Sequence, residues 1–99
     1  MADDLILAPE ARQDLEEAYA WYERRQLGLG EVFLSRVDAC LQAILRRPEM
    51  LSPVLKDYRR ALVRRLPCAV FHEYSDGVVT VYGVFHTSRD PKKWRRRLA

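Results

Sequence analysis

Apolar residues recur at helical spacing through the first quarter of the chain. They lie at offsets of four, seven, eight and eleven residues, which places them on one stripe of a helix: Ala11, Leu15, Ala18, Tyr19 and Tyr22. Pro9 suits the first turn of this helix, which is expected to run to about Gln26. Before it, the short apolar run from Leu5 to Leu7 predicts a brief N-terminal strand.

A second helical stripe follows a turn that is rich in glycine. Gly28 and Gly30 interrupt the first pattern, and Pro48 forbids continuation of the second. Between them the helical spacing returns in Phe33, Val37, Cys40, Leu41 and Ile44. Two helices joined by a short turn predict an antiparallel helical hairpin.

The second half of the chain changes to the two-residue period of strands. Residues 48–57 are expected to form an irregular connection, because prolines and a serine interrupt scattered apolar positions. The segment Tyr58 to Leu66 alternates and predicts a strand, with Arg60, Leu62 and Arg64 on one face. Next, Cys68 to Tyr74 and Val78 to His86 flank Asp76-Gly77 and predict a hairpin. Its second strand carries apolar residues on both faces and is expected to be central.

These elements predict an α+β fold in one domain spanning residues 1–99. A short N-terminal strand and an antiparallel helical hairpin pack on a small antiparallel β-sheet, followed by a short basic C-terminal helix or tail. Asp90-Pro91 suits the start of that helix. Because a helical hairpin covers only one face of a sheet, the C-terminal tail or a second chain must cover the other.

Charge is distributed unevenly along the chain. Residues 1–57 hold 7 Lys/Arg and 11 Asp/Glu, a net charge of −4, whereas residues 58–99 hold 10 and 3, a net charge of +7. This asymmetry favours an anionic partner of the second half, either nucleic acid or an acidic protein segment. A solvated basic face is the alternative that needs no function.

Composition excludes several classes of protein. Hydrophobic residues make up 48% and charged residues 31%, values typical of a globular chain. Its apolar runs are too short to span a bilayer, and the acidic N-terminus is unlike a signal peptide, so a cytoplasmic protein without a membrane partner is expected. Cys40 and Cys68 lack the spacing of a zinc site and are expected to be free thiols. No metal and no cofactor are expected.

Three stretches of the chain resemble the RelE/ParE superfamily of bacterial toxins. The first helix carries Ala11, Asp14-Leu15, Ala18 and Trp21-Tyr22. The second helix carries Phe33 and ends at Pro48, and the end of the domain carries Val84-Phe85-His86, Arg89-Asp90-Pro91 and Trp94. The segment from Arg59 to Cys68 resembles the family's basic strand and its aromatic-Pro-aromatic corner, although Leu66 and Cys68 here replace both aromatics. The motifs are closer to the ParE-like branch.

This resemblance implies the toxin of a type II toxin–antitoxin module, neutralised by a cognate antitoxin. ParE-like members poison DNA gyrase, arrest growth and stabilise plasmids, whereas RelE-like members cleave ribosome-bound messenger RNA as endoribonucleases. The ParE-like inhibitor, a non-enzymatic toxin, is favoured here. A RelE-like nuclease and a degenerate toxin that retains only antitoxin binding are the alternatives.

Cleavage of RNA without a metal requires a base, a cation and an acid. Glu73, Arg64 or Arg65, and His86 are the candidates for these catalytic roles. By strand alternation His86 shares a face with Val84 and Tyr82, and Glu73 faces opposite to His72 and Tyr74. No tyrosine follows His86 closely, which weakens the nuclease hypothesis. A structural, hydrogen-bonded role for His86 is the alternative.

Binding residues follow from the resemblance and from the position of the basic strand. Target binding, to gyrase or to the ribosome and its messenger RNA, is assigned to Arg64, Arg65, His86, Arg89 and Trp94. Antitoxin binding is assigned to Leu15, Tyr22, Arg60, Leu62 and Arg64. Packing alone is the alternative for Tyr22 and Trp94. Two assemblies are consistent with an open sheet face, a homodimer or a toxin–antitoxin hetero-oligomer.

Overall fold

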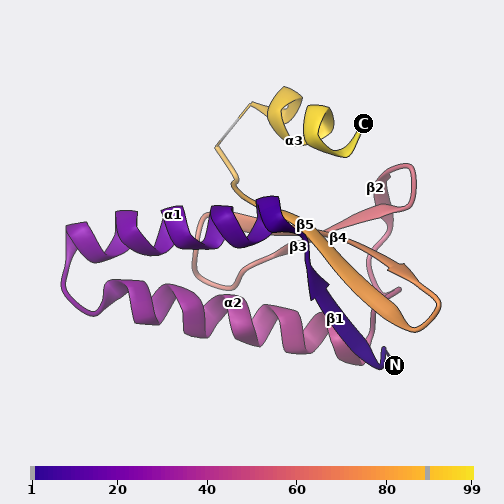
Figure 1. Cartoon of the computed structure of the whole chain (residues 1–99), viewed down its shortest axis with the longest axis horizontal. Helices are drawn as coiled ribbons and strands as arrows, with labels where there is room; N and C mark the ends of the chain where they lie inside the picture. Colours follow the sequence, from indigo (N-terminus) through magenta and orange to yellow (C-terminus); the bar gives the residue numbers. More distant parts are fainter. Residues whose placement is uncertain (1, 89) are drawn as a thin grey trace.

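A five-stranded sheet lies at the centre of the computed structural model, which describes residues 2–88 and 90–99 (Figure 1). Its order is β1-β5-β4-β3-β2. The strands span β1 Asp4–Leu7, β2 Pro53–Leu55, β3 Tyr58–Leu62, β4 Cys68–Ser75 and β5 Val78–His86. β1 pairs parallel with β5, and the other neighbours are antiparallel. The predicted antiparallel sheet spans β2 to β5, and the N-terminal strand β1 adds a parallel pairing at its edge, which makes the whole sheet mixed.

The β3 strand is shorter than its sequence pattern predicts. It ends at Leu62 because the chain turns there: the N–H of Val63 donates to the carbonyl of Cys68 (2.9 Å), and the N–H of Leu66 donates to that of Val63 (3.3 Å). Arg65 has a φ of 63° in this turn. Arg64 and Arg65 therefore lie in a turn, not on a strand. The residues 48–57 also contain β2, which the sequence did not predict.

A β-bulge on β5 changes which side chains share a face. Phe71 pairs with Gly83 but His72 pairs with Val81, so Tyr82 is the extra residue. As a result Val84 packs with the helical hairpin, whereas Tyr82 packs on the opposite face. The prediction that Tyr82 and Val84 share a face is therefore wrong. The other prediction about faces is confirmed. Glu73 lies beside Tyr82, on the face away from the hairpin, whereas His72 and Tyr74 lie on the hairpin side.

The two predicted helices form an antiparallel hairpin, α1 (Pro9–Arg25) and α2 (Leu29–Arg46). The turn between them uses Gly28, whose φ of 90° is costly for other residues. The Glu23 carboxylate accepts hydrogen bonds from the N–H groups of Gly28 and Gly30, which lower the pKa of Glu23. Tyr22 stacks on Phe33 across the hairpin, with ring centroids 5.2 Å apart.

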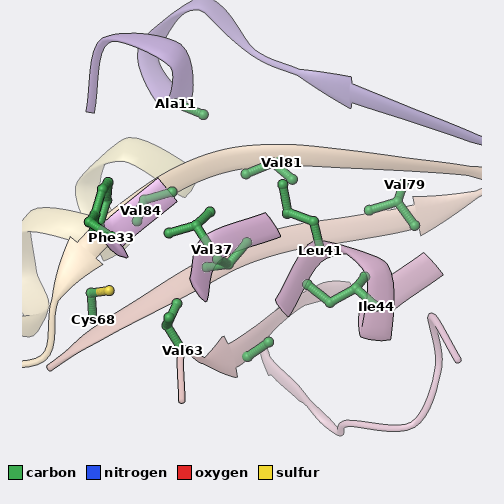
Figure 2. Packing of buried hydrophobic residues seen from close by; sticks show 12 residues of the cluster. Ala11, Phe33, Val37, Leu41, Ile44, Val63, Cys68, Val79, Val81 and Val84 are labelled. Carbon is green, nitrogen blue, oxygen red and sulfur yellow. The ribbon is translucent and has the colours of Figure 1, made fainter. Parts of the chain in front are cut away.

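The larger core lies between this hairpin and one face of the sheet. Figure 2 shows Phe33, Val37, Leu41 and Ile44 of α2 directed at the strands. They meet Cys68, Val79, Val81 and Val84 from the sheet and Val63 just after β3. Ala11 of α1 is fully buried in the same cluster. Most residues of the predicted helical stripes therefore contribute to this core, but Tyr19 lies outside it and donates a hydrogen bond from its hydroxyl to Glu31.

The opposite face of the sheet is covered in part by α3 (Pro91–Leu98), across the sheet from α2 (Figure 1). As predicted, Asp90 caps this helix, because its side chain accepts from the N–H of Lys92 (2.9 Å). Trp94 stacks on Phe71 at 4.8 Å, and Leu98 is buried beside it. The sequence left open whether the C-terminal tail or a second chain covers this face of the sheet, and it is the C-terminal segment that lies there. None of the described helices is long and apolar enough to cross a membrane.

Asp14 connects α1 to both β5 and α3. Its carboxylate accepts a hydrogen bond from the N–H of Val84 (2.9 Å), next to the bulge. The same oxygen is ion-paired with Arg97 of α3, whose guanidinium also lies 4.5 Å from the Phe85 ring centroid. Both groups are partly withdrawn from water, with side-chain exposures of 13% and 28%. One carboxylate therefore helps to hold three elements together.

Replacing Asp14 should destabilise the protein more than replacing Arg97. Asp14→Ala leaves the Val84 N–H without its partner and should lower the free energy of unfolding by about 2–3 kcal/mol. Arg97→Ala leaves that hydrogen bond intact and should cost about 1 kcal/mol. Urea denaturation measures both values. Equal losses would contradict this account of Asp14.

His72 should make stability depend on pH. It is 1% exposed, and its burial lowers its pKa from 6.5. The imidazole is thus neutral in the fold, and as the pH falls below about 6.5 the unfolded chain binds a proton more readily than the folded chain. The free energy of unfolding should fall between pH 7 and pH 5, and His72→Phe should flatten this part of the profile. An equal slope in His72→Phe and in the wild type would refute the prediction.

Candidate functional site

A small basic pocket lies at the end of the sheet beneath α3. Arg60 of β3, His86 at the end of β5 and Arg95 of α3 line it, together with Thr87 and Pro91. Phe71, Phe85 and Trp94 contribute an apolar wall. The pocket has a volume of about 200 Å³. Its two guanidinium groups could bind an anionic group such as a carboxylate or a phosphate.

The tautomer of His86 is set by the residues after it. Nδ1 accepts a hydrogen bond from the backbone N–H of Ser88 (3.1 Å) and lies 2.6 Å from the Ser88 hydroxyl oxygen. Because Nδ1 accepts, the neutral ring carries its proton on Nε2. The exposed His86 can therefore act as a hydrogen-bond donor through Nε2.

The basic turn between β3 and β4 lies beside this end of β5. The N–H of Thr87 donates to the carbonyl of Pro67 (2.8 Å), which connects the turn to the residue after His86. Arg64 and Arg65 are both exposed in the turn. Arg64 lines a second, larger groove formed by β3 and α2, on the helical side of the sheet. The arginines of this end are thus divided between two surfaces.

Glu73 lies away from the other candidate catalytic residues. In the β4–β5 ladder Glu73 pairs with Thr80, whereas His86 pairs with Cys68, five positions back along β4. Five strand residues span roughly 17 Å. Glu73 accepts instead a hydrogen bond from the Tyr82 hydroxyl (3.4 Å), and burial raises the pKa of Tyr82. The hypothesised base and acid of a nuclease are therefore not brought together.

The remaining assigned residues differ in how they are presented. Trp94 is 8% exposed, so its ring packs on the sheet instead of facing solvent. Leu15 and Tyr22 are partly buried against the larger core, and burial raises the pKa of Tyr22. Leu62 is 66% exposed at the end of β3, beyond the residues that pair with β2. Arg89 lies outside the described residues.

Sequence reasoning assigned no role to Arg95, which joins Arg60 and His86 only after α3 folds onto the sheet. The sequence did contain an indication of this role. Trp94 and Leu98 are four residues apart, a spacing that buries one side of α3 and exposes its arginines. Leu62 and Arg64, which the sequence assigned to antitoxin binding, line the groove beside α2. Among the described residues, no group of three or more His, Cys, Asp or Glu side chains is arranged to hold a metal ion.

Comparison with known proteins identifies the family. A family model described as the ParE toxin of the type II toxin-antitoxin system parDE matches residues 5–91. No curated protein matches the chain significantly. The fold is similar to that of a chain in a solved structure titled "Chromosomal ParDE TA system from P. aeruginosa", with 14% sequence identity, coverage of 86% of this chain and 96% of that chain, and a TM-score of 0.63. Because the family model spans most of the 99 residues, the chain belongs to the ParE toxin family of type II toxin–antitoxin systems.

Proposed function

We propose that this chain is a toxin that inhibits DNA gyrase in the cytoplasm and is neutralised by a cognate antitoxin. Membership of the ParE toxin family, over residues 5–91, is the observation that carries the proposal. The solved structure with a similar fold is titled as a ParDE toxin–antitoxin system, which supports an antitoxin as partner.

Geometry supports a binder over a nuclease. General acid–base cleavage requires its acid and base on opposite sides of one reacting group, within hydrogen-bond reach. Glu73 and His86 are separated by five positions of the β4–β5 ladder. The Glu73 carboxylate instead accepts a hydrogen bond from the Tyr82 hydroxyl. A binder makes no such demand, since it needs only complementary shape and charge.

The exposed basic residues at this end of the sheet supply such a charged surface. Arg64 and Arg65 lie on the turn, and His86 is exposed, with Nδ1 accepting from the N–H of Ser88. We assign the gyrase contact to this surface, with Trp94 holding α3 in place beneath it. The contact with gyrase would be electrostatic at its rim and therefore sensitive to salt.

Expression in bacteria should arrest growth through gyrase. We expect relaxed or broken plasmid DNA and intact messenger RNA, measured on the same cultures by plasmid topoisomer gels and by transcript integrity. His86→Ala should weaken growth arrest only modestly, since a binder loses one polar contact among several, whereas a nuclease that uses His86 as its general acid would lose activity on the order of 10²–10⁴-fold. If messenger RNA is cut while plasmid supercoiling stays normal, the proposal is wrong and the chain is a RelE-like nuclease. Absence of arrest would indicate a degenerate toxin.

Reversing charge on the basic turn should weaken gyrase inhibition. The double variant Arg64→Glu, Arg65→Glu should raise the half-inhibitory concentration in a supercoiling assay by about tenfold or more, because opposite charges would become like charges at the contact. Arg12→Glu, an exposed change on α1, is the matched control and should have little effect. An unchanged value in the double variant would remove these arginines from the target surface.

A further inference from the structure

The exposed side of α3 carries a concentration of positive charge that the fold does not need. Of its eight residues, five are basic and none is acidic: Lys92, Lys93, Arg95, Arg96 and Arg97. Trp94 and Leu98 hold the helix on the sheet. Within residues 2–88 and 90–99, Arg97 is the only one of the five in an ion pair. Like charges three and four positions apart on a helix repel one another, so an anionic partner would stabilise this side of α3.

The basic pocket beneath α3 extends this charge onto the sheet. Arg60 reaches the pocket from β3 and Arg95 from α3. The Arg95 guanidinium lies 5.3 Å from the Trp94 ring centroid, a contact that favours its position beside the pocket. His86 can donate through Nε2, because its Nδ1 accepts from the N–H of Ser88. No carboxylate is among the described residues that line the pocket, so these donors are available to an anion from outside.

The size of the pocket restricts what that anion can be. Its volume of about 200 Å³ is below the roughly 300–1,000 Å³ of pockets that enclose a whole small molecule. It suits one anionic group of a larger partner, and two guanidinium groups match the two free oxygens of a phosphodiester. Basic residues continue from the pocket along the eight residues of α3, which span about 12 Å. Duplex DNA carries one charge per roughly 1.7 Å of its axis, so several phosphates would meet these cations together.

The aromatic wall of the pocket separates duplex from single-stranded nucleic acid. Phe71, Phe85 and Trp94 are only 1%, 6% and 8% exposed. Phe71 stacks on Trp94 and meets Phe85 edge to face, so these rings are used within the protein. Single strands are bound largely by stacking of their bases on exposed aromatic rings, which this surface does not offer. A duplex keeps its bases stacked inside and presents its phosphates, which is what a surface of cations can bind.

We propose that this chain binds the phosphate backbone of duplex DNA, with one phosphodiester in the basic pocket and its neighbours against the exposed cations of α3. Arg60, His86 and Arg95 are the ligands of the phosphodiester in the pocket. Contacts to the backbone alone carry no base sequence, so binding should be independent of sequence. The inference goes beyond gyrase inhibition and does not depend on it, because the duplex is bound without gyrase.

The test measures binding of the purified chain to a fluorescently labelled duplex, two helical turns long, by anisotropy. The dissociation constant should be on the order of micromolar at physiological salt, and its logarithm should rise with the logarithm of salt concentration with a slope of about 3. Arg95→Gln should raise the dissociation constant about tenfold and lower that slope by about one. Arg12→Gln removes the same charge from the exposed side of α1 and should bind as the wild type does. Equal affinities of the two variants would overturn the proposal.

Two further variants separate a pocket from diffuse attraction to a basic helix. Arg95→Lys retains the charge but loses the planar fork, so it should keep the salt slope and still bind about threefold more weakly. Arg96→Gln, on the same helix but outside the pocket, should weaken binding less than Arg95→Gln does. Equal losses in Arg95→Gln and Arg96→Gln would overturn the pocket. Because Arg95 and Arg60 are both exposed, their glutamine variants should fold, and Arg60→Gln provides a second measurement of the pocket.

Competition distinguishes the duplex from other anions. Displacement of the duplex by polyglutamate at equal charge concentration would assign the surface to an acidic protein segment and overturn the proposal. Tighter binding of a single-stranded RNA of the same length would overturn the choice of duplex DNA. A chain that binds the duplex but leaves supercoiling by gyrase unchanged would refute the proposed function alone. A chain that inhibits gyrase but has no affinity for the duplex would refute this inference alone.

Discussion

The fold depends on one constraint, which is that β4 and β5 bury apolar side chains on both faces of the sheet. Val70, Val79 and Val81 face the helical hairpin, while Phe71 and Phe85 face the other side. Burial of such side chains is the main stabilising contribution in a domain of this size. One hairpin cannot supply both coverings, so α3 must return to the sheet and place Trp94 and Leu98 on its second face.

That requirement also creates the charged surfaces. When Trp94 and Leu98 are buried, the other side chains of α3 are directed to solvent, and most of them are basic. Arg95 thereby reaches Arg60 and His86 across the sheet. On the hairpin side, α1 packs along β5 and α2 lies nearer β3, and the groove opens between α2 and β3. Two distinct surfaces follow, a basic pocket beneath α3 and a groove beside α2.

Local patterns predicted most of the elements. The stripe from Ala11 to Tyr22 and the stripe from Phe33 to Ile44 became α1 and α2, because a helical period depends only on near neighbours. Asp76-Gly77 formed the expected hairpin turn, with φ values of 53° and 79° that suit these residues. Asp90 capped α3 for the same local reason.

Features set by distant contacts could not be predicted. A period of two is the same in parallel and antiparallel strands, so the parallel pairing of β1 with β5 left no signal. The bulge at Tyr82 depends on the register of β4, and it reversed the expected face of one residue. Asp14 and Arg97 are 83 positions apart, and only the folded chain brings them together. Glu73 and His86 failed to converge for a related reason, since the register of the hairpin fixes their separation.

The most direct test of the central claim is a supercoiling assay with purified DNA gyrase, relaxed plasmid and this chain. The account predicts that supercoiling falls as the chain is added and that prior addition of the antitoxin restores it, with no cleavage of RNA in a parallel translation reaction. Undiminished supercoiling at concentrations well above those of the enzyme would contradict the claim that gyrase is the target.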